Sequence, residues 1–184
     1  MTEVDAGDVL RARAGDRDAF DRLAVRSIDR LYRVARLVLR DTEQAEDAVQ
    51  ETLVRSWRDL PALREPDRFD AWLNRLLMRA INDEFRSASR ARSAVTFLRL
   101  EPSSRDQSDD VVVREQLSRG FDRLTVEHRA VIVLRLYLGL SLEETAASLG
   151  IPAGTAKSRL HYATAAMRDA LEADARPPVK EVSA

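Results

Sequence analysis

The sequence predicts an all-α protein made of two small helical domains joined by a flexible linker. Apolar residues recur at the spacing of one helix face through most of the chain, and only 6 Gly and 6 Pro interrupt its 184 residues. A polar segment rich in Ser, Asp and Pro divides this pattern near its middle. We therefore expect a first domain at 1–92, a linker at 93–112, a second domain at 113–172 and a disordered tail at 173–184.

Three long helices are expected in the first domain. Asp41 is placed to cap the second helix, and Asp67 is placed to cap the third, after a loop bounded by Pro61 and Pro66. The residues expected on the inner helix faces are Phe20, Leu23, Ile28, Leu31, Ala35, Val38, Leu39, Ala45, Ala48, Val49, Thr52, Leu53, Ser56, Trp57, Leu60, Phe69, Trp72, Leu73, Leu76, Ala80, Ile81 and Phe85.

The linker is polar except for the short apolar run at 95–98, which reads Val-Thr-Phe-Leu. Such a run is compatible with docking in a partner's groove. An extension of the third helix that packs on the first domain is the plainer alternative, and it is favoured somewhat over docking.

The second domain ends in two helices around a tight turn. Ser141 and Glu144 have the spacing of a capping box, and Gly150 is placed to end the first of the two helices. Before them, Thr125 is placed to cap an apolar helix that Gly139 ends. The last helix is expected to point Thr155, Lys157, Ser158, Arg159 and His161 outward and Ala156, Leu160, Ala163 and Met167 inward. This pattern predicts a helix-turn-helix that reads duplex DNA; the plainer alternative is a helical hairpin with a solvated face.

The charge distribution indicates two different partners. Net charge is −1, and 28 of the 30 basic residues are Arg, whose planar donors suit phosphates and base edges. Residues 41–51 hold five acids and no base, whereas residues 75–92 are rich in Arg. An acidic face suits a basic protein surface, and a basic face suits nucleic acid.

Composition argues against an enzyme. The chain has no Cys, its only histidines are His128 and His161, and it carries no phosphate-binding Gly loop or metal-ligand spacing. No cofactor or metal is therefore expected. No apolar run is long enough to span a bilayer, and the N-terminus lacks the apolar stretch of a signal peptide. We expect a cytoplasmic protein.

Three motifs in this order carry a specific resemblance. The segments AEDAVQETLVRSW, FDAWLNRL and GIPAGTAKSRL, within roughly residues 10–171, resemble an extracytoplasmic-function (ECF) sigma factor of bacterial RNA polymerase. The resemblance implies a protein that directs core polymerase to promoters. It also implies contacts with the beta and beta-prime subunits, promoter DNA and an anti-sigma factor.

The resemblance assigns roles to matching positions of the first domain. Asp47, Gln50, Glu51 and Arg55 would form the face that binds the polymerase clamp helices; the plainer alternative is a solvated acidic helix start. The loop at 60–67, which includes Arg64, matches the family's base-capturing loop in position. The remaining residues assigned to the −10 element are Asn74, Arg75, Arg79 and Asn82. Core packing is favoured for Trp57 and Phe69, while for Trp72 it is balanced against base stacking.

The second domain would read the −35 element through Thr155, Lys157, Ser158, Arg159, His161 and Tyr162. The chain departs from the family pattern at Tyr162 and Thr164, which stand where basic residues are usual, and at Arg79, where Asn is frequent. Fewer phosphate contacts predict weaker −35 binding with a smaller salt dependence.

Two other functions compete with the sigma-factor interpretation. A helix-turn-helix regulator that acts without polymerase would leave the acidic segment and the first domain unexplained. A sigma-like adaptor that has lost DNA binding is compatible with Tyr162 and Thr164.

Overall fold

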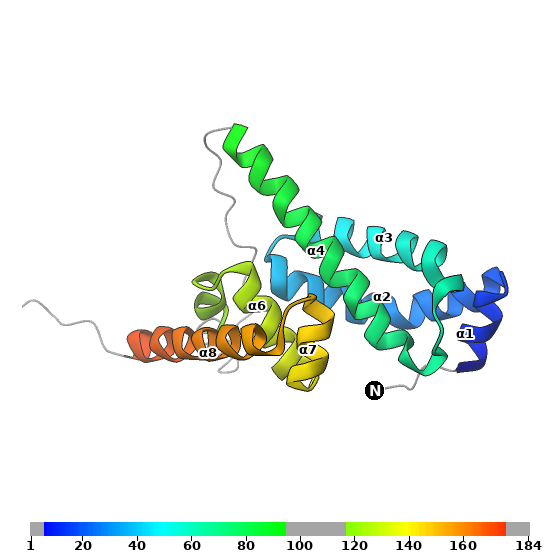
Figure 1. The fold of residues 1–184 in the computed structure, drawn as a ribbon. Helices are drawn as coiled ribbons and strands as arrows, with labels where there is room; N and C mark the ends of the chain where they lie inside the picture. Colours follow the sequence, from blue (N-terminus) through cyan, green and yellow to red (C-terminus); the bar gives the residue numbers. More distant parts are fainter. Residues whose placement is uncertain (1–5, 95–116, 176–184) are drawn as a thin grey trace, which may run out of the picture.

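The protein is helical throughout the residues that the structure describes, 6–94 and 117–175, and no strand occurs among them (Figure 1). The structure is a computed structural model. Its helices are α1 (Ala6–Arg13), α2 (Arg17–Leu39), α3 (Thr42–Asp59), α4 (Phe69–Ala94), α6 (Val126–Ile132), α7 (Leu142–Leu149) and α8 (Ala153–Ala175), with a short helix at 117–122. The linker beyond residue 94, its apolar run at 95–98, and the tail beyond residue 175 lie outside the described residues.

The first domain packs α2, α3 and α4 together, with α1 against the N-terminal part of α2 (Figure 1). Asp41 caps α3 as predicted, because its carboxylate accepts a hydrogen bond from the Gln44 amide at 3.0 Å. Asp67 does not have the predicted role. It lies inside the 3-10 turn η2 (Pro66–Arg68), and α4 begins only at Phe69.

The sequence interpretation missed α1, which an ion-pair cluster anchors to α2. Asp8 is buried, and its carboxylate lies 2.6 Å from Arg11, 2.8 Å from Arg22 and 3.5 Å from Arg26. Hydrogen bonds from Arg22 and then Arg11 lower the pKa of Asp8 to about 2, so it stays ionised. Asp8 therefore ties the N-terminal helix to the domain.

Most residues expected on the inner faces are buried, among them Leu23, Leu31 and Leu73. Two are not. Ile28 is 42% exposed, and Trp57 is 39% exposed with its ring edge-on to Phe20 at 4.9 Å. Helical spacing misplaced both because they lie at the border of a stripe, where the neighbouring helix covers only one side of the side chain.

The second domain has the predicted caps. Ser141 and Glu144 form a full capping box, Gly150 ends α7 with φ +66°, and Thr125 accepts a hydrogen bond from the His128 amide at 3.3 Å. The apolar helix is not uniform, because α6 passes into a π-helical turn, η3 (Val133–Tyr137), before Gly139 turns the chain with φ +71°.

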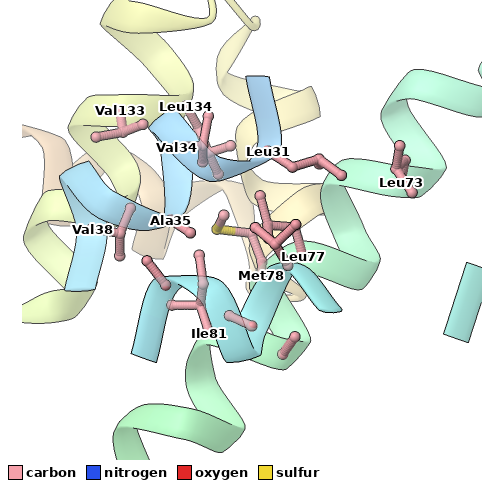
Figure 2. Packing of buried hydrophobic residues seen from close by; sticks show 14 of the residues in the cluster. Leu31, Val34, Ala35, Val38, Leu73, Leu77, Met78, Ile81, Val133 and Leu134 are labelled. Atoms are coloured by element: carbon pink, nitrogen blue, oxygen red, sulfur yellow. The ribbon is translucent and has the colours of Figure 1, made fainter. Parts of the chain in front are cut away.

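The two domains pack against each other and share one apolar core, which the sequence interpretation did not anticipate. Val34 and Val38 of α2 lie beside Val133 and Leu134 of η3 (Figure 2). Helix α7 also contacts α4. At the end of α2, the Arg40 side chain donates hydrogen bonds to the short helix at 117–122.

Candidate protein and nucleic-acid interfaces

The acidic segment predicted to bind a protein forms the exposed side of α3. Asp47 and Gln50 are exposed, whereas Glu51 and Arg55 are half-buried. Arg55 is already engaged, since it donates to Glu51 at 2.6 Å and to Asp83 of α4 at 2.9 Å, and these bonds raise its pKa. Within the predicted group, Asp47, Gln50 and Glu51 offer polar atoms to a partner, while Arg55 braces α3 against α4.

Negative charge extends from α3 onto α4. Arg55 contacts both Glu51 of α3 and Asp83 of α4, which places these two carboxylates beside each other. The pKa of Glu84 is raised by burial and then by the charges of Asp47, Asp83 and Glu51. Asp83 and Glu84 were not among the predicted contact residues, because they belong to another helix and come together with α3 only in the folded domain.

An apolar border adjoins the acidic face. Val54 is 56% exposed and Trp57 is 39% exposed. Both follow Asp47 and Gln50 at three- and four-residue steps, so they lie on the same side of α3. Sequence reasoning assigned Trp57 to the core and passed over Val54, although this spacing was a sufficient signal.

The loop predicted to capture a base is held by two apolar anchors. Leu60 is fully buried and Leu63 nearly so, while Arg64 between the turns η1 (Leu60–Ala62) and η2 is exposed. The loop therefore has a fixed base and presents a cationic side chain to solvent.

Three of the predicted −10 residues share one face of α4. Arg75, Arg79 and Asn82 follow each other at four- and three-residue steps; Arg79 and Asn82 are exposed and Arg75 is half-buried. A hydrogen bond from Arg58 lowers the pKa of Asp59, and the charge of Arg79 contributes. Arg79 therefore adds positive charge to the surroundings of Asp59, the last residue of α3.

Asn74 does not join this face. Its side chain is only 3% exposed, and its oxygen accepts a hydrogen bond from Arg30 of α2 at 2.6 Å. Arg30 also contacts Asp70 at 2.6 Å. The prediction that Asn74 reads a base edge does not fit this arrangement, because the amide is used to join α2 to α4.

The surroundings of Trp72, near the start of α4, favour a role in core packing over a role in stacking on a DNA base. Phe69 is buried as predicted, and Trp72 is partly buried against the same core, with its ring 5.8 Å from that of Phe69.

The predicted −35 residues lie on the first half of α8, after the turn at Gly150. Lys157, Ser158, His161 and Tyr162 are exposed, and Thr155 and Arg159 are half-buried. On the opposite side, Ala156 and Ala163 are fully buried, as predicted. The helix thus rests on small residues and turns a polar, cationic side to solvent, the geometry by which such a helix enters a major groove.

A second apolar surface lies at the far end of α8. An open groove of about 560 Å³ runs between the short helix at 117–122, α6 with η3, and α8. It is lined by Leu117, Phe121, Ile132, Leu136, Thr164, Met167, Arg168, Leu171 and Glu172. Sequence reasoning did not find it, because its lining comes from three separate segments.

Within the described parts of the chain, no group of three His, Asp or Glu residues is arranged to hold a metal ion. None of the helices described there has the length and apolar character needed to cross a membrane.

The two domains match two family models in order. Residues 23–91 match Sigma-70 region 2, and residues 120–169 match Sigma-70, region 4. The chain is 40% identical over 147 residues to "ECF RNA polymerase sigma factor SigL" of Mycobacterium tuberculosis, covering 77% of this chain and 82% of the relative. It is 33% identical to "RNA polymerase sigma-E factor" of Streptomyces avermitilis, covering 83% of this chain and 87% of that one.

Two solved structures are similar to this chain in fold. A structure of CnrH in complex with the cytosolic domain of CnrY is similar with a TM-score of 0.65 and 29% identity, covering 93% of this chain and 99% of that chain. RpoE of Bartonella quintana, solved with the anti-sigma factor NepR, has the same fold with a TM-score of 0.65 at 24% identity, covering 84% of this chain and 98% of that chain. The regulator without polymerase is not favoured, because both sigma domains are present. The chain belongs to the ECF family of RNA polymerase sigma factors, which is not a family of catalytic enzymes.

Proposed function

We propose that the exposed side of α3 binds core RNA polymerase. Its acidic residues Asp47 and Glu51, with Gln50 between them, complement a basic protein surface such as the clamp helices of the beta-prime subunit. The adjoining Val54 and Trp57 supply apolar area, which interfaces use at their centre. This combination of an acidic and an apolar strip on one helix is the observation that carries the proposal.

We propose that the −10 element contacts the loop with Arg64 and the face of α4 that holds Arg75, Arg79 and Asn82. The arginines suit backbone phosphates, and Asn82 suits a base edge. The −35 element is assigned to Thr155, Lys157, Ser158, Arg159, His161 and Tyr162 of α8. Catalysis belongs to the polymerase, so neither domain requires a cofactor.

The apolar groove beside α8 is proposed as the contact with the beta subunit. Leu136, which lines the groove, is 62% exposed, and an apolar helix of a partner would cover this apolar side chain. An anti-sigma factor is the other expected partner, because the sigma factor RpoE, which has the same fold, is solved in complex with the anti-sigma factor NepR. The similar CnrH is also solved with a bound protein, the cytosolic domain of CnrY. The cytoplasm is the proposed location, because the proposed contacts with polymerase and promoter DNA would be made there.

A core-binding titration tests the α3 assignment. Asp47→Lys with Glu51→Lys is expected to weaken binding to core polymerase at least tenfold, about 1.4 kcal/mol, because like charges then face a basic surface. The matched control is Asp29→Lys with Asp169→Lys, which makes the same charge change at exposed sites on α2 and α8. Equal affinity of the two variants would remove α3 from the proposed interface.

A promoter-occupancy assay with reconstituted holoenzyme tests α8. Arg159→Ala is expected to cost roughly 1–3 kcal/mol if the guanidinium contacts a base edge, and to relax preference at one position. Arg33→Ala on α2 is the matched control. A loss that is equal for all −35 sequences would mean that Arg159 contacts phosphate instead.

A further inference from the structure

The outward side of α8 carries short side chains in its first two turns. Gly154, Ser158 and Tyr162 follow each other at four-residue steps, and all three are exposed, so they form one stripe along the helix. The Ser158 hydroxyl donates to the Gly154 carbonyl at 3.0 Å and therefore lies close to the helix backbone. Another molecule can approach this part of α8 closely, and Tyr162 is the first large side chain of the stripe that it meets.

Tyr162 and its neighbour His161 form one aromatic surface. Tyr162 is 64% exposed, and its ring centre lies 5.6 Å from that of His161, with the ring planes inclined at 66°. Aromatic rings favour this edge-on arrangement. Consecutive helix residues do not ordinarily face each other, so the contact shows that the two exposed rings lean together on the outward side. His161 thereby limits the orientations open to the Tyr162 ring.

The cations in this half of the helix lie beside the stripe and not on it. Each residue of a helix is turned by about 100° from the one before, so Lys157 and Arg159 lie on opposite sides of Ser158. Between these two cations, the outward side presents the aromatic ring of Tyr162, which carries no positive charge. The centre of the proposed DNA-reading surface is therefore aromatic carbon, and its charges are at the flanks.

An aromatic ring at this place is complementary to one feature of duplex DNA. In the major groove every base presents hydrogen-bonding atoms, and thymine alone adds a methyl group at C5. A ring without a positive charge gains less from a phosphate than a cation does, but it gains from covering apolar carbon. Removing one methyl group from water is worth about fourfold in affinity. The aromatic surface of α8 therefore fits a thymine better than another base or the backbone.

Resting on the proposed function of α8, we propose that Tyr162 determines specificity in the −35 contact by packing on the C5-methyl group of a thymine, with His161 holding its ring in place. Tyr162 thus differs in role from the cations beside it. It recognises a base through apolar contact, and it adds nothing to the salt dependence of binding. A T·A pair, with the thymine on either strand, is expected opposite Tyr162 in the −35 element.

Deletion of single methyl groups from the DNA tests this contact with the unaltered protein. Holoenzyme reconstituted from core polymerase and the full chain first selects bound promoters from a pool with randomised −10 and −35 elements. Each −35 thymine of a selected promoter, on either strand, is then replaced by deoxyuridine, which lacks only the methyl group. We expect about a fourfold loss of affinity at one position in a competition assay. Equal affinity of every deoxyuridine promoter and its thymine parent would overturn the proposal.

Variants at position 162 show which side chain makes the contact. Tyr162→Phe keeps the ring and should keep the methyl effect, whereas Tyr162→Ala should abolish it; the site is exposed, and circular dichroism checks that the fold is retained. Tyr162→Arg should also abolish the methyl effect, and one added phosphate contact should steepen the slope of log affinity against log salt by roughly 0.9. A methyl effect that persists in Tyr162→Ala contradicts the proposed contact.

The selection itself distinguishes a failure of the −35 assignment from a failure of the Tyr162 contact. If the holoenzyme enriches no −35 sequence, the assignment of α8 to the −35 element is wrong, and the role of Tyr162 fails with it. If it enriches a −35 sequence in which no thymine methyl group affects affinity, α8 keeps its proposed function and only the role of Tyr162 is overturned.

Discussion

The two domains differ in how much of a core each has to itself. The first buries long stripes of α2, α3 and α4 within one cluster. The second has a small cluster of its own, made of Leu124, Val131, Ile132 and Ala163, while Val126, Ala130, Val133 and Leu134 join the core of the first domain. A domain with so small a private core depends on its neighbours, either the first domain or a partner in its place.

The largest expected effect tests this dependence. Leu77→Ala in the first domain and Leu134→Ala at the domain contact each empty a fully buried site and should cost about 2–5 kcal/mol. Both tryptophans, Trp57 and Trp72, lie in the first domain, so their fluorescence reports that domain alone in urea unfolding, whereas circular dichroism reports every helix. Leu134→Ala should make helix loss precede the fluorescence change, and Leu77→Ala should not. Coincident transitions in Leu134→Ala would show that the second domain is self-sufficient.

A smaller effect on stability is expected to distinguish a structural asparagine from a DNA-binding one on α4. Asn74→Ala should lower the free energy of unfolding by about 1–3 kcal/mol, because Arg30 then loses a buried acceptor. Asn82→Ala, at an exposed site on the same helix, should change it by less than about 0.5 kcal/mol yet reduce promoter melting. Thermal unfolding and a permanganate melting assay compare them; a stable Asn74→Ala protein with defective melting would return Asn74 to the DNA interface.

In the second domain, the cap of α7 should matter by about 1 kcal/mol. Ser141→Ala removes the hydroxyl that accepts from the Glu144 amide at 3.1 Å, and it should lower stability by that amount. Ser158→Ala is the control, since the Ser158 hydroxyl bonds only to its own helix at the Gly154 carbonyl in the described contacts. It should leave stability unchanged and weaken −35 binding instead. Differential scanning calorimetry distinguishes the two.

The smallest expected effect is on the free energy of unfolding at acidic pH. Hydrogen bonds from Arg22 and Arg11 lower the pKa of Asp8 from 3.8 to about 2, so the unfolded chain binds more protons between these values. The contribution of Asp8 is complete above about pH 4 and is lost as the pH falls toward 2. Asp8→Asn should flatten stability across this window, as measured by urea midpoints; an unchanged slope would show that Asp8 is not protonated there.

Structural features could be predicted where they depend on contacts between residues close together in the sequence. The caps at Asp41, Thr125 and Ser141 and the turn at Gly150 depend on residues within four positions of each other. The exposed side of α8 was likewise predictable, because helical spacing alone sets which of its residues share a face. Asn74 could not be placed in this way, because the partner that turns it inward, Arg30, lies 44 residues away.

Sequence patterns predicted the helices other than α1, the caps at Asp41, Thr125 and Ser141, the two sigma-type domains and the faces that carry acid or base, because these depend on helical periodicity and short-range capping. The tertiary structure was needed to tell which predicted contact residues face a partner and which are already bonded inside the protein. Asn74 and Arg55 belong to the second group, since they bond to Arg30 and Asp83. The tertiary structure also showed three features that the sequence did not predict. These are the acidic surface shared by α3 and α4, the groove beside α8 and the packing of one domain on the other. Those features are made by residues far apart in the chain, and their contacts exist only after the helices have packed.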